Sequence, residues 1–345
     1  MASMKKTVSF TRNAVNVFFH ILTRCNLRCR HCYINPGQHG KADLDTDTVI
    51  SWLRLFRDVT RKGPAETSNL VLLGGEPTLH PGLPEIVGAA RQMGYESITI
   101  DTNGYLFNDI LDKTTPAAVD YFSFSLDGAT PETNDRLRGA GSYARCVEGI
   151  RAAVAKGFAA SLIYTVSSEN ARELPLMVPL LQELGVTRFF IQVIGIRGRS
   201  AQLEGLSSDG PLQLTRAQWE DTVPPVARAA ADAGITATYP KVFLAPGELF
   251  ECAGNVAENY FIFPNGRVYR CPLCEDYPLH ALAIDDAGRL LATGKINEAD
   301  LFSLDIPEGC VINKLVQGGN IDYDESGRPR CRIACCLLKE EVSPV

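Results

Sequence analysis

Residues 15–33 read VNVFFHILTRCNLRCRHCY, an apolar run followed at once by three closely spaced cysteines. The run over residues 15–22 is rich in β-branched and aromatic residues, which predicts a buried strand. Cys25, Cys29 and Cys32 follow it in a C-x3-C-x2-C pattern. Three thiolates can bind three irons of a [4Fe–4S] cluster and leave the fourth iron open, whereas clusters that only carry electrons take four cysteines. An open metal position is typical of catalysis. A zinc knuckle or a purely structural cluster is the alternative.

Composition limits the classes of protein that the chain can represent. Its 345 residues are 45% hydrophobic, enough for a large core, and the length favours two domains. With a net charge of −6 and no tract of Lys and Arg, we expect no nucleic-acid partner. The sequence has no apolar stretch of 18 residues, so no membrane span is predicted. Its N-terminus does not resemble a signal peptide. The 11 cysteines therefore favour metal binding or catalysis in a reducing cytoplasm over disulfides.

Strand-like and helix-like segments alternate along the first 200 residues. Such alternation predicts a parallel sheet, open or curled into a partial barrel, whose active site lies where the strands end. The cysteine triplet comes directly after the first of these strands. The predicted strands are residues 15–22, 70–73, 97–101, 121–126, 161–166 and 188–193, and the predicted helices between them are residues 46–59, 83–93 and 143–156.

The pattern changes near residue 200. Residues 200–213, SAQLEGLSSDGPLQ, predict an exposed connection, and residues 219–233 predict a last helix. The stretch FIFPNGRVYRCP at 261–272 predicts a β-hairpin, because two β-prone runs flank Pro-Asn-Gly. We expect a first domain over residues 1–235 and a second, metal-rich α+β domain over residues 236–345. Seven of the 11 cysteines lie in the second part: Cys252, Cys271, Cys274, Cys310, Cys331, Cys335 and Cys336.

Three short motifs follow the cysteine triplet, each at the end of a predicted strand. They are GGEP at 74–77, TNG at 102–104 and SLDG at 125–128, the last trailed by Arg138 and Gly139. Each alone is ordinary turn chemistry. Together and in this order they resemble the radical S-adenosylmethionine (radical SAM) superfamily over residues 15 to about 198. The resemblance implies a partial (β/α)6 TIM-like barrel.

The resemblance also implies a cofactor site. Tyr33 would contact the adenine of SAM, Gly75 and Glu76 the amino end of its methionine, and Ser125 and Asp127 the carboxylate or ribose. The loop at 192–195 would flank the adenine. In this family one electron from the cluster cleaves SAM to methionine and a 5′-deoxyadenosyl radical, which abstracts a substrate hydrogen. The expected cofactor-binding residues are Tyr33, Gly74, Gly75, Glu76, Pro77, Thr102, Asn103, Ser125, Asp127, Arg138, Gln192 and Ile194, with no general acid or base identified.

The cysteine-rich tail resembles a second feature of the family. Cys252-x13-Gly266-x4-Cys271 is similar to the opening of SPASM and twitch extensions, which carry auxiliary [4Fe–4S] clusters. Cys252 and Cys271 are the surest ligands, and the other five cysteines compete for the remaining positions. Seven thiols are one short of eight, so we expect one auxiliary cluster, or a second one with an open iron or a ligand other than cysteine. Adjacent Cys335 and Cys336 should have different roles. Zinc is the rival metal.

Several further residues carry weaker signals. Cys146 lies in a predicted amphipathic helix and is expected to be a small buried hydrophobe. His31 and His80 could exchange protons, although His80 is better explained as a loop residue. Glu275 and Asp276 beside Cys274 are expected to be a solvated pair.

The predicted function is that of a radical SAM enzyme with a peptide or small-molecule substrate, with peptide maturation favoured. Only about 14 residues precede the first predicted strand, too few for a fused leader-binding domain, which weakens the case for peptide maturation but leaves it open because a separate protein can recognise the peptide. A small-molecule dehydrogenase, a rearrangement enzyme or a cofactor-biosynthesis enzyme is the alternative. Flavodoxin or ferredoxin is the expected reductant. A non-catalytic electron carrier would explain the cysteines but not the motifs at successive strand ends.

Overall fold

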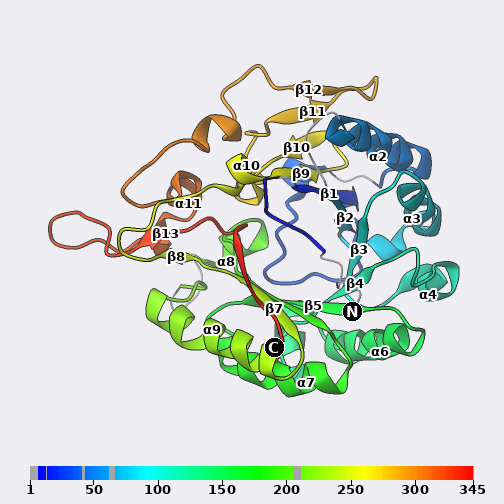
Figure 1. The fold of residues 1–345 in the computed structure, drawn as a ribbon, viewed down its shortest axis with the longest axis horizontal. Helices are drawn as coiled ribbons and strands as arrows, with labels where there is room; N and C mark the ends of the chain where they lie inside the picture. The colour runs from blue at the N-terminus through cyan, green and yellow to red at the C-terminus, as the bar shows by residue number, and fades with distance from the viewer. Residues whose placement is uncertain (1–6, 13, 41–42, 62–66, 205–210, 345) are drawn as a thin grey trace.

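The computed structural model describes residues 7–12, 14–40, 43–61, 67–204 and 211–344, and a curled sheet with helices around it dominates these residues (Figure 1). Its twelve strands follow the order β12-β11-β10-β9-β1-β2-β3-β4-β5-β6-β7-β14. The central strands from β1 to β7 run parallel. Within the described residues no helix is long and apolar enough to cross a membrane.

The six predicted strands form the middle of this sheet, and the partial (β/α) barrel is confirmed. Strands β1 to β7 follow one another in the sheet in the order in which they occur in the chain, as is common for consecutive elements. The strands are β1 (Ala14–Leu22), β2 (Thr67–Gly74), β3 (Ser97–Thr102), β4 (Tyr121–Ser125), β5 (Ala160–Val166) and β6 (Arg188–Val193). The predicted helices are α2 (Thr46–Arg61), α3 (Leu83–Gln92), α6 (Ser142–Ala155) and α9 (Arg216–Asp232), with the shorter α7 (Met177–Glu183) before β6.

The two faces of the barrel strands have opposite chemistry. On the outer face, Val15, Val17, Phe19 and Ile21 of β1 are fully buried under the helices, and the Phe19 ring stacks on Trp52 of α2 at 5.9 Å. The register places the alternate residues of all strands on one inner face. That face is polar at many positions, which suits a barrel that receives a ligand. It carries Asn16, His20, Asn69, Thr99, Asp101, Ser123, Ser125, Ser161, Thr165, Arg188 and Gln192.

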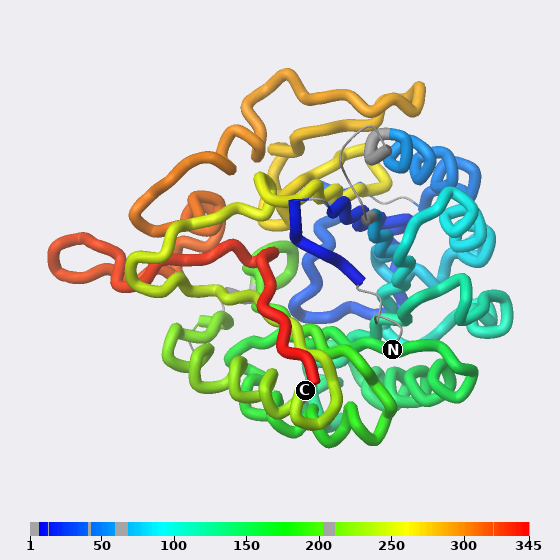
Figure 2. Tube along the Cα trace, viewed as in Figure 1, coloured from blue at the N-terminus to red at the C-terminus, as the bar shows by residue number. Residues whose placement is uncertain are grey.

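The C-terminal part of the chain extends the barrel at both edges. At one edge β9 (Glu258–Ile262) pairs in parallel with β1 and continues into β10 (Arg267–Tyr269), β11 (Leu282–Ile284) and β12 (Leu290–Ala292). At the other, β7 (Thr236–Pro240) pairs with β6, and β14 (Lys339–Val342) pairs antiparallel with β7. Figure 2 shows this last stretch of chain entering the barrel edge. The boundary between residues 235 and 236 stays a prediction.

The predictions for residues beyond 200 are partly wrong. The β9–β10 hairpin is confirmed, with Gly266 at a φ of 81° in its turn. The connection predicted over 200–213 begins within a short helix, α8 (Arg199–Glu204), and its residues 205–210 lie outside the described residues. Helix α9 is not the last one. Short helices α10 (Ala253–Val256) and α11 (Val311–Val316) follow, together with a strand pair of β8 (Phe243–Leu244) and β13 (Arg332–Ile333).

Candidate active site

The loop that carries the cysteine triplet lies directly against the loop that follows β2. The Gly75 N–H donates to the Leu22 carbonyl at 3.1 Å, and the Glu76 N–H donates to the Arg24 carbonyl at 3.0 Å. A Cβ atom added to Gly75 would lie 2.0 Å from the Arg24 oxygen, so only glycine fits there. The glycines of GGEP are therefore required by contact between two backbones at the end of β1.

Glu76 joins this contact to the loop after β3. Its side chain is fully buried, and one carboxylate oxygen accepts from the Thr78 N–H at 3.1 Å and from the hydroxyls of Thr78 and Thr102 at 2.6 and 2.8 Å. The other oxygen accepts from the Asn103 N–H at 2.7 Å. Burial raises the pKa of Glu76, and these hydrogen bonds oppose the rise. Both oxygens are engaged within the protein, so the carboxylate holds TNG in place beside the cysteines.

Asn103 completes the link to the cysteine loop. Its side-chain amide donates to the Asn26 side-chain oxygen at 2.7 Å, one residue beyond Cys25. Three motifs that are distant in sequence thus meet at one end of the barrel: the cysteine triplet, GGEP and TNG.

Asp127, like Glu76, is a buried carboxylate that fixes the cysteine loop, but it does so through His31. It is fully buried, and its carboxylate lies 2.5 Å from the Arg138 guanidinium, 3.0 Å from His31 Nε2 and 2.7 Å from the Thr165 N–H. Burial disfavours the carboxylate, but Arg138 and His31 outweigh it and hold the pKa of Asp127 well below its ordinary range. Because His31 lies between Cys29 and Cys32, this ion-pair cluster orients the triplet.

The three thiols suit an iron–sulfur cluster. Cys25 is exposed, and Cys29 and Cys32 are half-buried on the same loop. Desolvation of its sulfur raises the pKa of Cys25 to about 12, and the nearby thiols Cys29 and Cys32 act in the same direction. The Leu27 N–H donates to Cys25 Sγ at 3.3 Å, a hydrogen bond that would stabilise a thiolate. Binding a metal cluster would release the thiol protons.

The loop after β6 connects the cysteine loop to the C-terminal part. The Arg197 guanidinium lies 4.5 Å over the Tyr33 ring, donates to the Pro272 carbonyl at 2.8 Å and forms an ion pair with Glu275. Tyr33 in turn donates its hydroxyl to His20 at 2.8 Å. A Cβ on Gly198 would lie 2.5 Å from the Cys32 carbonyl oxygen, so this loop also packs backbone against backbone.

The interpretation of Glu275 and Asp276 as a solvated pair is wrong. Glu275 is 1% exposed, and Asp276 accepts from the Gly198 N–H at 2.6 Å and from the Asn35 side chain at 3.1 Å. Both carboxylates therefore fasten the C-terminal part to the loops that follow β1 and β6. Local sequence does not reveal this, because the partners are about 75 and 240 residues away.

Six of the seven C-terminal cysteines gather in a second centre. The Cys335 thiol raises the pKa of Cys252, the Cys274 thiol raises that of Cys271, and burial together with neighbouring thiols raises those of Cys310 and Cys336. Cys331 interacts with Arg216, Glu220 and Asp322 instead. Within the part of the chain that the structure describes, no three His, Cys, Asp or Glu side chains are grouped as ligands of a single metal ion.

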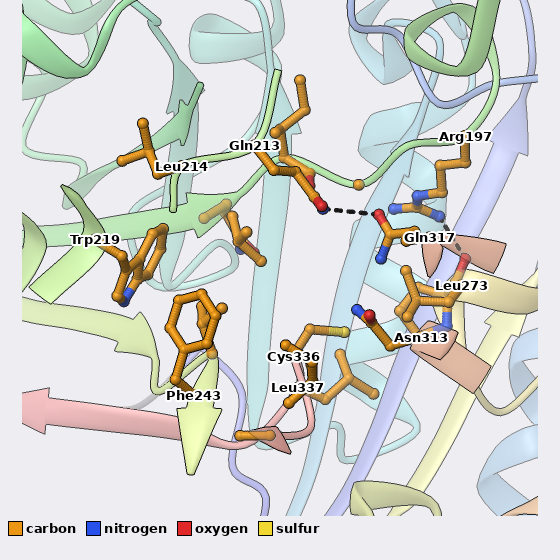
Figure 3. Close-up of a pocket in the computed structure, with 18 residues that line it drawn as sticks. Arg197, Gln213, Leu214, Trp219, Phe243, Leu273, Asn313, Gln317, Cys336 and Leu337 are labelled. Atoms are coloured by element: carbon orange, nitrogen blue, oxygen red, sulfur yellow. Dashed lines mark hydrogen bonds between the residues drawn. The ribbon is translucent and has the colours of Figure 1, made fainter. Parts of the chain in front are cut away.

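The adjacent cysteines Cys335 and Cys336 differ in their surroundings, and their different roles stay a prediction. Cys335 accepts from the Ala253 N–H at 3.4 Å, next to Cys252. Cys336 lines a cavity of about 90 Å³ that also involves Gln192 and Ile194, two of the expected cofactor-binding residues (Figure 3). Cys146 is 1% exposed, which confirms its assignment as a buried hydrophobe. His80 bridges the Leu44 carbonyl and the Gly82 N–H, as a loop residue would.

Comparison with known proteins identifies the family. Residues 19–195, just over half of the chain, match the Radical SAM superfamily. The chain belongs to this superfamily. Membership of the superfamily implies SAM and a [4Fe–4S] cluster as cofactors.

Relatives of known name include pre-heme d1 synthase of Dinoroseobacter shibae, 28% identical over 195 residues, which are 56% of this chain and 46% of that protein. A probable GTP 3′,8-cyclase of Saccharolobus solfataricus is 30% identical over 168 residues, 48% of this chain and 53% of that protein. The chain thus spans about half the length of the curated relatives that it matches.

Solved structures resemble the chain over a longer range. Streptococcus suis SuiB bound to precursor peptide SuiA matches with a TM-score of 0.56 and 14% identity over 92% of this chain and 69% of that one. Native anSMEcpe with bound AdoMet matches with a TM-score of 0.56 and 12% identity, over 90% of this chain and 85% of that one. The shared fold thus extends beyond the barrel into the C-terminal part.

Some residues of the site are not evident from sequence. Arg197, His20 and Lys339 are examples, since each gains its importance from a partner on another strand or loop. An arginine directly after a predicted barrel strand is the one signal that could have identified Arg197.

The backbone contact at Gly75 generates a first prediction. Gly75→Ala should destabilise the fold by about 1–3 kcal/mol or more, because the added methyl overlaps the Arg24 carbonyl, and should lower the iron content. Gly88→Ala is the matched control: nothing lies within 4 Å of its added Cβ in α3, so a gain of about 0.5–1 kcal/mol is expected. Urea unfolding and iron analysis under anaerobic conditions measure both. Unchanged stability and iron in Gly75→Ala would contradict the contact.

The Arg197–Glu275 pair generates a second prediction. Arg197→Met should cost about 3–5 kcal/mol of unfolding free energy, because it leaves Glu275 buried without its partner. The double variant Arg197→Met/Glu275→Leu should recover most of that loss, since both charges are removed. Arg216→Gln, which breaks an exposed pair with Glu220, should cost no more than about 0.5 kcal/mol. A double variant as unstable as Arg197→Met would show that the ion pair is not the source of the effect.

Proposed function

We propose that Cys25, Cys29 and Cys32 bind the [4Fe–4S] cluster and that the adjoining loops bind SAM, so that a 5′-deoxyadenosyl radical is generated at this end of the barrel. The support is geometric. The three thiols share one loop, which is fixed by GGEP on one side and by the Asp127 cluster on the other. The cluster and SAM supply the radical chemistry.

The chain's own residues would position the loops of the site and shield the site from water. Glu76 and Asp127 would act chiefly by holding the loops at the ends of β2, β3 and β4, since their carboxylates are fully engaged with protein groups. Ser125, at the end of β4 on the inner face, remains directed at the barrel interior for contact with SAM. Arg197 covers Tyr33 and would exclude water from that side of the site.

The C-terminal part, residues 236–345, would hold one auxiliary [4Fe–4S] cluster. The grouping of Cys252, Cys271 and Cys335 favours these three as ligands, with Cys274, Cys310 and Cys336 as candidates for the fourth. Cys331 is the least favoured because its neighbours are charged residues rather than thiols. Flavodoxin or ferredoxin would supply the electron, and the reducing cytoplasm is the proposed location.

A peptide is the favoured substrate. The observation that carries this proposal is the similarity of fold over about 90% of the chain, C-terminal part included, to SuiB bound to a precursor peptide and to anSMEcpe with AdoMet and the Cp18Cys peptide, the latter with a TM-score of 0.51. A separate protein could recognise the peptide. Small-molecule cofactor synthesis is the second candidate, because the curated relatives include a GTP cyclase and a pre-heme d1 synthase. Those sequence matches cover only about half of the chain.

The ligand assignment generates a third prediction. After anaerobic reconstitution, the Cys25→Ala/Cys29→Ala/Cys32→Ala variant should lose about four irons and all release of 5′-deoxyadenosine. Cys271→Ala should lose the irons of the auxiliary cluster and keep SAM cleavage. Cys331→Ala and Cys146→Ala serve as matched controls and should change neither quantity, because their thiols lie outside both centres.

Iron content and SAM cleavage together decide among the outcomes. About eight irons per chain with cleavage support both clusters, whereas about four with cleavage leave the C-terminal centre to zinc or free thiols. A reducible cluster without cleavage contradicts the radical function and favours an electron carrier. Incubation with a candidate precursor peptide, GTP or a tetrapyrrole then tests the substrate class, by a SAM-dependent change in mass.

A further inference from the structure

The cavity beside Cys336 lies between the barrel and the C-terminal part and is described by two walls (Figure 3). One wall is apolar and includes Leu214, Trp219 and Phe243. The other carries four side-chain carboxamides from three separate segments, since two of them belong to α11 and its C-cap. Its volume, about 90 Å³, exceeds the roughly 10–15 Å³ that one water needs, so the cavity has room for a group of several atoms. The carboxamides belong to Gln192, Gln213, Asn313 and Gln317.

Hydrogen bonds within the protein fix which end of each carboxamide remains available. Gln192 accepts from Lys339 at 3.1 Å through its oxygen, which leaves its NH2 group as a donor. Gln317 accepts from the Ile196 N–H at 2.6 Å and from Gln213 at 3.0 Å, which likewise leaves its NH2 group. Gln213 uses its NH2 group on Gln317 and on the Ile194 carbonyl, which leaves its oxygen as an acceptor. The wall therefore offers donors and acceptors together.

Asn313 shows that this wall lacks an occupant. The residue is 6% exposed, and its side-chain oxygen is buried without a hydrogen-bond partner among the described residues. Trp219, on the apolar wall, has a buried indole N–H in the same condition. A buried polar group without a partner costs about 1–3 kcal/mol, so a ligand that supplies the missing bond gains affinity.

Charge narrows the class of ligand. The one charged side chain lining this cavity is Arg197, which already pairs with Glu275. A carboxylate or phosphate accepts hydrogen bonds only and could not satisfy the oxygens of Asn313 and Gln213. An amide has one C=O and at least one N–H, which match the donors and acceptors of this wall.

We propose that this cavity is a substrate subsite for a neutral amide, either one peptide unit or the side chain of an Asn or Gln. The inference rests on the proposed function and specifies its substrate as amide-bearing. The adenine of SAM is the rival occupant, since Gln192 and Ile194 were expected to flank it. Against adenine, none of Tyr33, Gly75 and Ser125 lines the cavity.

Trp219 provides a direct test, because the chain contains two tryptophans and the other, Trp52, lies in α2. In a Trp52→Phe background, reconstituted anaerobically and kept free of SAM and reductant, emission would report on Trp219 alone. Titration with propionamide, which carries a single amide, should give a saturable change. The matched acid, propionate, carries no amide and should bind at least about tenfold more weakly. Asn313→Leu and Gln213→Leu should each weaken the amide probe about tenfold. Gln182→Leu, an exposed carboxamide on α7, should have no effect.

Three results would overturn the subsite: no saturable change, equal binding of the amide and acid probes, or displacement of the amide by S-adenosylhomocysteine, which would make the cavity the adenine site. Asn313→Leu could weaken binding indirectly, by disturbing the nearby Cys310. Gln213 is far in sequence from the cysteines, so loss of binding in Gln213→Leu as well would show that the carboxamides themselves matter. Assays of 5′-deoxyadenosine on the same samples separate the two proposals. Cleavage and peptide modification without probe binding reject the subsite alone, whereas probe binding without cleavage rejects the radical function.

Discussion

The arrangement of the site depends on one contact in which two backbones touch with no side chain between them. The loop after β2 lies against the loop after β1, and the Arg24 carbonyl occupies the space that a side chain on Gly75 would need. Because the backbones are this close, Glu76 is buried at the point from which it reaches Thr102 and Asn103. The cysteine loop is thereby held by protein groups before any cofactor binds, which lowers the entropy lost on assembling the site.

The second constraint is the group of contacts around Arg197. A guanidinium with five N–H donors can stack on Tyr33, bond the Pro272 carbonyl and pair with Glu275 at once, as a lysine could not. A buried ion pair contributes little net stability, because desolvation offsets most of the attraction. The ion pair here fixes the position of the C-terminal part relative to the barrel. The C-terminal centre is held against the loop after β6 in one orientation, so the distance between the two cysteine centres is fixed.

Local patterns predicted the barrel well. The run over residues 15–22, the glycines of GGEP and the Pro-Asn-Gly turn each carry a signal that depends on near neighbours. Three other features carry no such local signal, because each depends on a partner far away in sequence. They are the burial of Glu275, the position of Cys331 outside the thiol group and the pairing of β14 with β7. Glu76 shows the same limit within a motif. Its presence was evident, but the engagement of both oxygens with neighbouring loops required the structure.

The strand order places the C-terminal part against both edges of the barrel. β9 pairs with β1 and β14 pairs with β7, so strands of the C-terminal part lie at both edges of the parallel sheet. The second centre and the barrel interior are close along the chain, since Cys335 and Cys336 belong to the centre and Lys339 donates to Gln192 on β6. Burial lowers the pKa of Lys339 to about 8. A substrate held between β6 and α11 would lie beside Cys336 of the second centre and beside the loop after β6.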